Sequence, residues 1–423
     1  MCNRYVVLWA ISIVALFSIT PNSWASDVHL SGFGTLAYSY EDEEGIGFRR
    51  DLAQPYDTTT NGSWLTDSRF GLHLDYSMNP NWRFTLQGVA KKRVSDDWLD
   101  VIEIGFVGYQ PSERWDIRLG RLPPDAFWAT ETRNIDFGHN WVRPPIEIYS
   151  WLPFQSVDGV DAVYFFYTDE IDWYISSQLG YFHTSVESPA GELVDTSGTE
   201  LVSLSLKALW GEWRARGSIL YSPGVSSEVS FSTQQLVNQL GGVSMMGLGT
   251  ISQEAQALSR ALIVEDEAVM YTQLGLEYFD GTWMVASELV SIHSDSDQVI
   301  LPSGLGGYVT LSYYVDGWSP YIIASAFSPD LDPQTAAVDW SSISPQLGYL
   351  QQQVINGVNL SRIEQQTWSL GLRWDVAKNI ALKAQIDLVE IAPNGYGLWA
   401  NEPELNSVET QLELYTLSLN FAF

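Results

Sequence analysis

Short segments in which apolar and polar side chains alternate recur along the chain, and this pattern limits the possible folds more than any other feature. Clear examples are residues 82–87, 115–120, 213–221 and 368–375. In the last segment, Trp368, Leu370 and Leu372 alternate with serine, glycine and arginine. A period of two places successive side chains on opposite faces of a β-strand, whereas a helix requires a period near 3.6. The chain is therefore predicted to be all-β.

The length of these segments and their aromatic ends indicate strands that cross a membrane. A spanning strand needs about 9–11 residues, whereas strands of soluble proteins usually have about five or six, and the segments fit the longer range. The chain contains 18 Trp and 21 Tyr, many of them beside turns, as in the aromatic girdles at the two membrane interfaces. The apolar face is thus expected to contact lipid and the charged face to line water.

Short turns and long polar stretches alternate between the predicted strands. Short turns are expected at 79–81, 111–114, 169–170, 211–212, 280–281, 316–317 and 377–379. Long stretches are expected near 41–67, 93–100, 122–155, 182–198, 222–267, 292–306, 328–366 and 389–409, with 256–263 as a candidate short helix. Seven turns and eight long loops connect sixteen strands, an even number that is typical of outer-membrane barrels. Since lipid offers no partner to an open edge, the sheet is expected to close around an aqueous channel.

The N-terminus has the pattern of a secretory signal peptide. Arg4 precedes an apolar run over residues 5–19, and Ser23, Trp24 and Ala25 form a small-residue cleavage pattern. Cleavage is expected after Ala25, which makes 1–25 a signal peptide and 26–423 a single transmembrane barrel domain. The only cysteine, Cys2, lies inside this signal, so no disulfide framework is expected.

Charge and motifs exclude several classes of function. The formal net charge is -30, with 51 acidic and 21 basic residues, which argues against nucleic acid as a partner. The five histidines are scattered singly, without metal-ligand spacing, and the chain has neither a nucleophile elbow nor a phosphate-binding loop. No catalytic residue, cofactor or metal site is predicted, and the chain is not expected to be an enzyme.

The two ends of the predicted barrel carry a resemblance to a known family. Leu30 to Gly34 open the first strand, and the last strand has an apolar or aromatic residue at every second position, namely Tyr415, Leu417, Leu419, Phe421 and Phe423. With the hairpins and the long third loop, the whole chain after residue 25 resembles the Gram-negative porins, without a match to a particular subfamily. The resemblance implies a homotrimer of sixteen-stranded barrels in the cell outer membrane, in contact with lipid and lipopolysaccharide. It also implies a third loop that folds into the lumen, and recognition of Phe423 by the barrel-insertion machinery.

Charged residues on the predicted lumenal face and in the third loop are the candidate pore lining. By alternation, basic side chains of early strands project inward, and the third loop would bring acidic and basic groups opposite them, where lining charges select ions. The candidates are Arg69, Arg83, Lys91, Arg118, Arg121, Asp125, Glu131, Arg133, Asp136, Arg143 and Glu147. The alternative is that these arginines balance lumenal carboxylates or hold the loop by salt bridges.

The function predicted from the sequence is that of a porin, a water-filled channel for passive diffusion of small hydrophilic solutes and ions. The acidic excess predicts a weak preference for cations. One alternative is a channel specific for sugars, peptides or organic acids, for which Trp128, Trp141, Tyr149 and Trp151 of the third loop could form an aromatic path. Another alternative is a surface receptor or adhesin whose long loops bind a partner.

Overall fold

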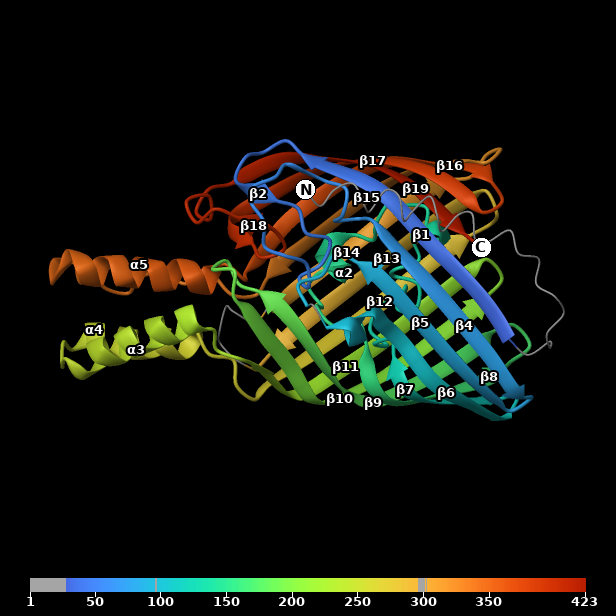
Figure 1. Cartoon of the computed structure of the whole chain (residues 1–423), viewed down its shortest axis with the longest axis horizontal. Helices are drawn as coiled ribbons and strands as arrows, with labels where there is room; N and C mark the ends of the chain where they lie inside the picture. Colours follow the sequence, from blue (N-terminus) through green and yellow to red (C-terminus); the bar gives the residue numbers. More distant parts are fainter. Residues whose placement is uncertain (1–27, 96, 296–300, 302) are drawn as a thin grey trace.

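The computed structural model describes residues 28–423 except 96, 296–300 and 302, and in this part the chain forms a closed antiparallel barrel of sixteen long strands (Figure 1). The predicted signal peptide lies outside the described residues. The strands are β1 (Val28–Glu41), β4 (Arg69–Asn79), β5 (Trp82–Lys91), β6 (Ile102–Ser112), β7 (Trp115–Leu122), β8 (Val157–Tyr167), β9 (Asp172–Glu187), β10 (Leu193–Trp210), β11 (Trp213–Ser227), β12 (Glu267–Phe279), β13 (Trp283–Ser294), β14 (Gly304–Tyr313), β15 (Trp318–Pro329), β16 (Ile363–Ala377), β17 (Ile380–Tyr396) and β19 (Thr410–Ala422).

Closure comes from the first strand, which pairs on both sides. β1 pairs antiparallel with β4 from Val28 opposite Tyr76, and with the last strand, β19, from Phe33 opposite Ala422. Every backbone group of the sheet can therefore find a partner within the protein, as a lipid environment requires. The two-residue strands add local pairings: β3 (Gly62–Ser63) joins β1, and β2 (Ile46–Gly47) pairs with β18 (Ala400–Asn401).

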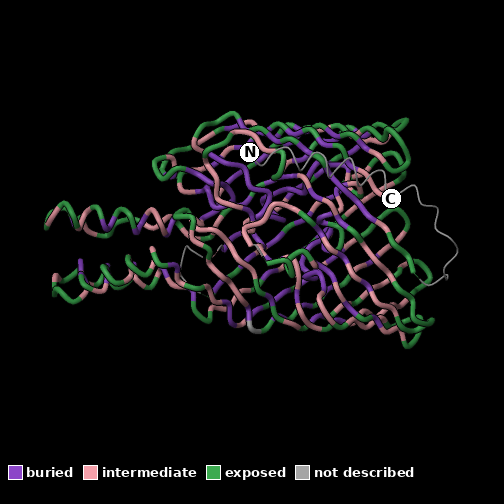
Figure 2. The backbone as a smooth tube through the Cα atoms, in the orientation of Figure 1, coloured by how far each residue is buried: buried purple, intermediate pink, exposed green. Residues whose placement is uncertain are grey.

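The alternation predicted from the sequence separates the outer and inner faces of the wall. In β14, Leu305, Val309 and Leu311 are exposed on the outside, whereas Tyr308 and Thr310 are buried inside. Figure 2 shows buried residues alternating with exposed ones along the strands. In β14 the leucine and valine side chains thus face outward and the tyrosine and threonine side chains face the lumen, which is the reverse of a soluble sandwich.

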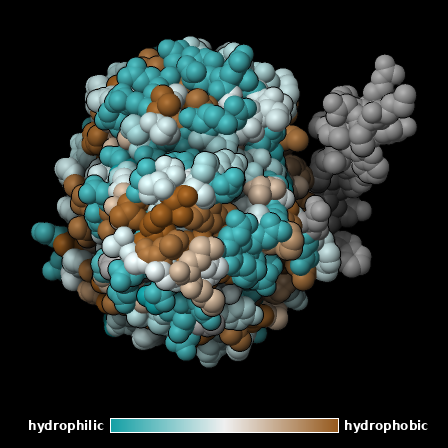
Figure 3. Space-filling model, turned by 90° about the vertical axis from the view of Figure 1, so that its left-hand side faces the viewer, coloured by the Kyte–Doolittle hydropathy of each residue, from teal (hydrophilic) through white to brown (hydrophobic). Residues whose placement is uncertain are grey.

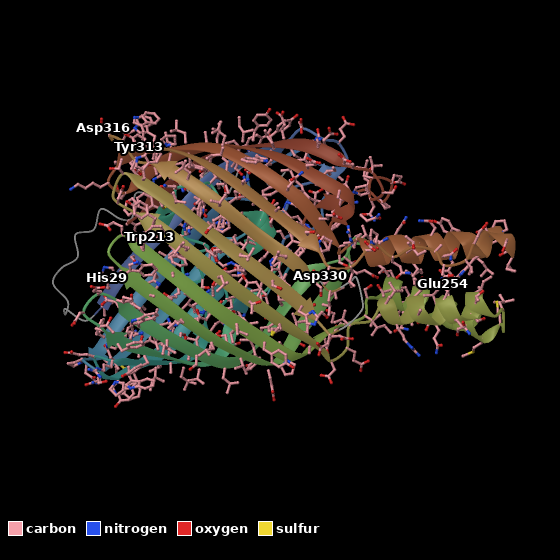
Figure 4. The ribbon with its side chains drawn as sticks, turned by 180° about the vertical axis from the view of Figure 1, so that it is seen from behind. His29, Trp213, Glu254, Tyr313, Asp316 and Asp330 are labelled. Carbon is pink, nitrogen blue, oxygen red and sulfur yellow. The ribbon has the colours of Figure 1, made fainter. Side chains whose placement is uncertain are left out.

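All seven predicted short turns are present, and the aromatic residues gather beside them. At Asp316 and Gly317 both residues have positive φ, as the tight two-residue turn of a β-hairpin demands. Aromatic rings of adjacent strands contact each other near these turns, with centroid distances of 4.6 Å between Trp283 and Tyr313 and 4.9 Å between Trp213 and Tyr278. Figure 4 shows Trp213 and Tyr313 at the end of the barrel that carries the Asp316 turn, so one girdle has the predicted position.

The prediction of a long loop over 182–198 is wrong for most of its length. β9 continues to Glu187 and β10 begins at Leu193, with Val186 opposite Val194 and Thr184 opposite Thr196. Only residues 188–192 form the connection. Serine, threonine and valine suit a strand pair that leaves the apolar belt, because β-branched and hydroxyl side chains pair well across strands, although such a segment is polar enough to be taken for a loop.

Two long connections build helices beyond the barrel, at the end opposite the short turns (Figure 1). α3 (Phe231–Met245) and α4 (Thr250–Ala261) form a helical hairpin between β11 and β12, and η4 (Trp340–Ser342) and α5 (Pro345–Asn359) lie between β15 and β16. The candidate helix at 256–263 corresponds to the second half of α4, whereas α3 and α5 were not predicted. Among the described residues, no helix is long and apolar enough to cross a membrane.

Candidate functional site: the lumen and its third loop

The third loop, residues 123–156 between β7 and β8, folds into the barrel and packs against its inner wall. It contains η3 (Asp136–Gly138), α2 (Ile146–Tyr149) and a set of buried aromatic side chains. Ring centroids of Trp151 and Tyr271 are 5.3 Å apart, and those of Phe154 and Phe182 are 4.1 Å apart. The inward fold expected for this loop is therefore present, and its apolar side is a core shared with the wall.

Asp136 attaches the loop to the wall formed by β1 and β4. Its carboxylate lies 2.6 Å from Arg50 and 3.3 Å from Arg69, and it accepts a hydrogen bond of 2.8 Å from the hydroxyl of Thr35. Burial alone would raise the pKa of this carboxyl, but the guanidinium groups of Arg50 and Arg69 hold the pKa below its usual value. The charged form of Asp136 thus stabilises the inward position of the loop.

Arg143 forms a second attachment, about seven residues later in the loop. Its guanidinium lies 2.9 Å from Asp67 and 2.6 Å from Asp387 of β17, and it also donates to the hydroxyl of Thr416. The ring of Phe48 lies 4.6 Å below the guanidinium. The Arg143 side chain is only 3% exposed, so its charge is neutralised by Asp67 of the first loop and Asp387 of the wall and does not face an open pore.

Carboxylates of the loop bind the remaining sides of the wall. Asp125 lies 2.8 Å from Arg216 of β11 and accepts a 2.6 Å hydrogen bond from Ser205 of β10. Glu147 accepts hydrogen bonds from the side chains of β15 and β16, namely Ser325 at 2.8 Å, Gln365 at 2.7 Å and Thr367. With Asp136 and Arg143, these contacts tether the loop around most of the barrel circumference.

Charged side chains of the wall also form hydrogen bonds with the loop. The carboxylate of Glu288 on β13 accepts hydrogen bonds from the hydroxyls of Tyr149 and Tyr308 and from the backbone amide of Trp128 at 3.0 Å. The ammonium of Lys383 donates to the backbone carbonyls of Asp136, His139 and Trp141 at 2.6 to 2.8 Å. Both groups hold the loop backbone in place.

Other lumenal charges keep contact with water. Arg83 pairs with Asp116 at 2.6 Å, with both side chains partly exposed. Arg118 pairs with Asp161 at 2.6 Å and with Glu131 at 2.8 Å, and the Glu131 side chain is 58% exposed. Both arginines stack on the ring of the buried Phe106, at 5.6 and 5.3 Å. We call Arg83, Asp116, Arg118 and Glu131 the water-facing charges.

Solved structures with the same fold exist, although no family model and no curated relative matches the sequence. A loop L8 deletion mutant of OmpT, an outer membrane protein of Vibrio cholerae, aligns with a TM-score of 0.53 at 10% identity, over 94% of this chain and 100% of that one. The outer membrane channel DcaP of Acinetobacter baumannii aligns with a TM-score of 0.52 at 11% identity, over 96% and 100%. OmpF of Salmonella typhi, solved in complex with daunomycin, has a TM-score of 0.52 at 10% identity, over 94% and 97%. The chain has the fold of an outer-membrane β-barrel.

In this barrel, the charged residues singled out from the sequence fall into three groups. The first has buried side chains that join the loop and the wall or lie at their contact, and comprises Arg69, Lys91, Asp125, Arg133, Asp136, Arg143 and Glu147. The second consists of Arg83, Arg118 and Glu131, which contact water.

Arg121 forms the third group and differs from the expectation, because it lies on the outer face of the wall. It stands on the same side of β7 as the exposed Leu119, opposite Gly105, and pairs with Asp158 of β8 at 2.8 Å. Two residues separate side chains that share a face of a strand, so the alternation that places Arg118 inside places Arg121 outside. Arg121 therefore does not line the lumen.

Several residues of the site were missed by the sequence analysis. Glu288, Lys383 and Asp387 occupy inward positions of regular strands, so the same alternation that identified Arg118 would have identified them. Arg50 and Asp67 belong to the first loop, and no sequence signal places them in the lumen. In the part of the chain that the structure describes, no group of three His, Cys, Asp or Glu residues is arranged to hold a metal ion.

Proposed function

We propose that the protein is an outer-membrane channel through which small hydrophilic solutes and ions diffuse passively. The observation that carries the proposal is the set of water-facing charges inside a closed barrel, beside a loop that folds inward. Charges that line a narrow passage select among ions. A barrel of 16 strands is wide enough to enclose an aqueous passage, which the third loop narrows.

The remaining features of the proposal concern assembly and selectivity. The protein would be exported with cleavage after Ala25, form one barrel domain from residue 26 onward and assemble as a homotrimer in contact with lipid and lipopolysaccharide. The formal charge of -30 supports a weak preference for cations, because a negative entrance raises the local concentration of positive ions.

Planar-bilayer recordings of the purified protein test this function. We expect stepwise conductance that rises linearly with salt concentration, and reversal potentials in a salt gradient that correspond to a modest excess of potassium over chloride permeability. Neutral sugars of increasing size would report the width of the passage. A complete lack of conductance would contradict the channel proposal, and a clear preference for chloride would contradict the proposed selectivity.

A substrate-specific channel is the second candidate, and the extent of loop tethering favours it. A loop fixed to β1, β4, β10, β11 and β15–β17 leaves a more restricted passage than a loop held at one point. Trp141, Tyr149 and Trp151 are buried against the wall, so of the aromatic path considered above only Trp128 is partly exposed. Saturation of the conductance by one solute at low concentration would distinguish this function from general diffusion.

A further inference from the structure

Lys207 of β10 is a lumenal cation without a direct partner. Ser205, two residues earlier on the same strand, donates to Asp125 of the third loop, so the side chain of Lys207 also points inward. This side chain is partly exposed. Within the part of the chain that the structure describes, its ammonium group forms no hydrogen bond and no ion pair. The three N–H donors of the ammonium group are therefore available to a molecule in the lumen.

The other basic side chains that point inward from the described strands are neutralised or saturated. Every such arginine has a carboxylate within 3.3 Å. Among the lysines, Lys91 lies 2.9 Å from Glu103, and the ammonium of Lys383 donates to three backbone carbonyls. A paired cation offers little to a passing anion, so Lys207 differs from the rest of the wall in what it can bind.

The charged groups that act on Lys207 most strongly already have partners. They are Asp125, Arg216, Glu131 and Arg118. Asp125 lies 2.8 Å from Arg216, and Glu131 lies 2.8 Å from Arg118. Both carboxylates are thus held by a guanidinium group, and neither forms an ion pair with Lys207. A carboxylate from a solute would supply the contact that the protein itself does not provide.

Aromatic rings lie on both sides of Lys207 along the wall. Tyr174 of β9 is its direct neighbour in one strand pair. In the other direction, Arg216 and then Gly275 follow on the next two strands, and a Cβ atom at Gly275 would lie only 2.9 Å from the ring of Trp128. Since adjacent strands are about 4.8 Å apart, this ring lies about 10 Å from Lys207 along the wall. Tyr174 and Trp128 are both partly exposed, and aromatic rings around a few polar groups are typical of sites for small organic molecules.

Lys207 lies on the side of the third loop that faces the short turns. It is three residues from Trp210, where β10 ends at a short turn, whereas the contact between Ser205 and Asp125 of the loop lies farther from this turn. The side chain of Arg214, on the next strand and nearer the turn, is 51% exposed. Figure 3 looks onto the opposite end of the molecule, which carries the long loops and the helices α3, α4 and α5. A solute that enters between the short turns therefore meets Lys207 before it meets the third loop.

We propose that Lys207, with Tyr174 and Trp128 beside it, binds the carboxylate of a small organic anion in the lumen. This inference rests on the proposed channel function and names a class of solute for it. It agrees with a weak overall preference for cations, because the formal charge of -30 acts on ions at the entrances, whereas Lys207 acts at contact distance.

Block of the ion current by benzoate tests the proposal. Benzoate carries a carboxylate on an aromatic ring, and benzamide has a similar shape without the charge. In planar bilayers with potassium chloride on both sides, benzoate should reduce the conductance in a saturable manner, and benzamide at the same concentration should not. Lys207→Gln should raise the half-blocking concentration of benzoate at least about tenfold, because the variant loses a hydrogen bond between two charged groups. Lys207→Arg keeps such a bond and should stay within about threefold of the unmodified protein.

Lys378→Gln is the matched control. Lys378 is an exposed lysine in the short turn between β16 and β17, at the same end of the barrel. Its substitution removes one positive charge from this end and should leave the half-blocking concentration of benzoate unchanged. Equal effects of the two glutamine variants, or equal block by benzoate and benzamide, would overturn the proposal.

Saturation-transfer NMR of benzoate with the full-length protein in detergent separates this site from the channel function. Transfer that is present with the unmodified protein and with Lys378→Gln but lost with Lys207→Gln supports the site, and a lack of conductance would then count against the channel proposal alone. Conductance without block and without transfer would overturn the site and leave the channel proposal intact.

Discussion

The third loop lies inside the barrel, whereas residues 229–264 and 333–361 form a helical extension outside it, which we call the prong. Both are built from long connections between strands, but their residues are buried in different ways. The third loop contains six charged residues, Asp125, Glu131, Arg133, Asp136, Arg143 and Glu147, most of them buried against charges or hydrogen-bond donors of the wall. The prong has three charged residues over a longer stretch and relies on its apolar core. Buried charges need partners in fixed positions. The barrel wall supplies these to the third loop, whereas the prong's one buried charge, the carboxylate of Glu254, finds its partners Ala337 and Trp340 within the prong.

The comparison predicts that substitutions in the two regions should have different effects on stability. Each tether of the third loop joins groups far apart in the sequence, such as Arg143 and Asp387, so the loss of one group leaves a buried charge in the wall. The prong depends on packing between its own two segments, so damage there should remain local. The following predictions test this difference, from the largest expected effect to the smallest.

Truncation of Arg143 should have the largest effect. Arg143→Ala leaves the buried carboxylate of Asp387 without its cation and leaves Asp67 with Arg50 alone, and breaking a buried ion pair by removing one partner costs about 3–5 kcal/mol. We expect a corresponding loss in the free energy of unfolding, measured by urea titration in lipid vesicles, and a higher single-channel conductance because the loop is released.

Arg121→Ala is the matched control for Arg143→Ala. The Arg121 pair with Asp158 lies on the outer face and is partly exposed, and such pairs contribute only about 0–1 kcal/mol. If both variants lost the same stability, or if Arg143→Ala left the conductance unchanged, the tethering role of Arg143 would be wrong.

Substitution of Glu254 should damage the prong alone. Glu254→Ala leaves the indole of Trp340 and the amide of Ala337 without an acceptor, and hydrogen bonds to a charged group contribute about 1.5–3 kcal/mol. We expect faster amide hydrogen exchange in α4 and α5 with unchanged exchange in the barrel strands. The control is Asp339→Ala, which removes the cap of η4 at an exposed position and should cost about 1 kcal/mol. Faster exchange in the third loop of Glu254→Ala would contradict the independence of the two insertions.

Acid should loosen the third loop. The pKa of Asp136 is lower than usual in the folded protein, so its contribution to stability is fully present above the pKa of an unfolded aspartate, about 3.9. This contribution is lost as the pH falls through the lower folded value. We expect the conductance to increase only at a pH below about 4, the range set by the same unfolded value. An increase already between pH 5 and 7 would mean that other groups control the loop.

Removal of one water-facing charge should have the smallest effect. Glu131 is largely exposed and pairs with Arg118, and two charges about 4 Å apart in water interact by about 1 kcal/mol. Glu131→Gln should therefore lower the potassium-to-chloride permeability ratio by less than about fivefold, measured from reversal potentials, without a change in stability. A larger ratio than in the unmodified protein would contradict the assignment of Glu131 to the passage.

Much of the barrel could be predicted from the sequence because the alternation of apolar and polar residues depends only on each strand itself. A strand between lipid and water must alternate along its own length, so the period of two identified the faces of segments such as 213–221 and 368–375 before any pairing was known. The seven short turns and the inward positions of Arg83 and Arg118 follow from the same rule. Applied with the correct register, the alternation would also have placed Arg121 on the outside and Glu288 and Lys383 inside.

The tertiary structure alone decided what the long insertions do. Whether Arg143 faces a solute or neutralises Asp67 and Asp387 depends on residues distant in the chain, and nothing near Arg143 in the sequence distinguishes the two. The helices α3 and α5 escaped prediction for a related reason, since the apolar side of α3 is completed by α4 of the same hairpin and that of α5 by η4 and by α4 of another connection, and neither arrangement is visible in the helix's own residues. The sequence determined the wall because each strand meets the same surroundings, lipid on one side and water on the other, whereas each loop meets surroundings that exist only once the barrel has closed.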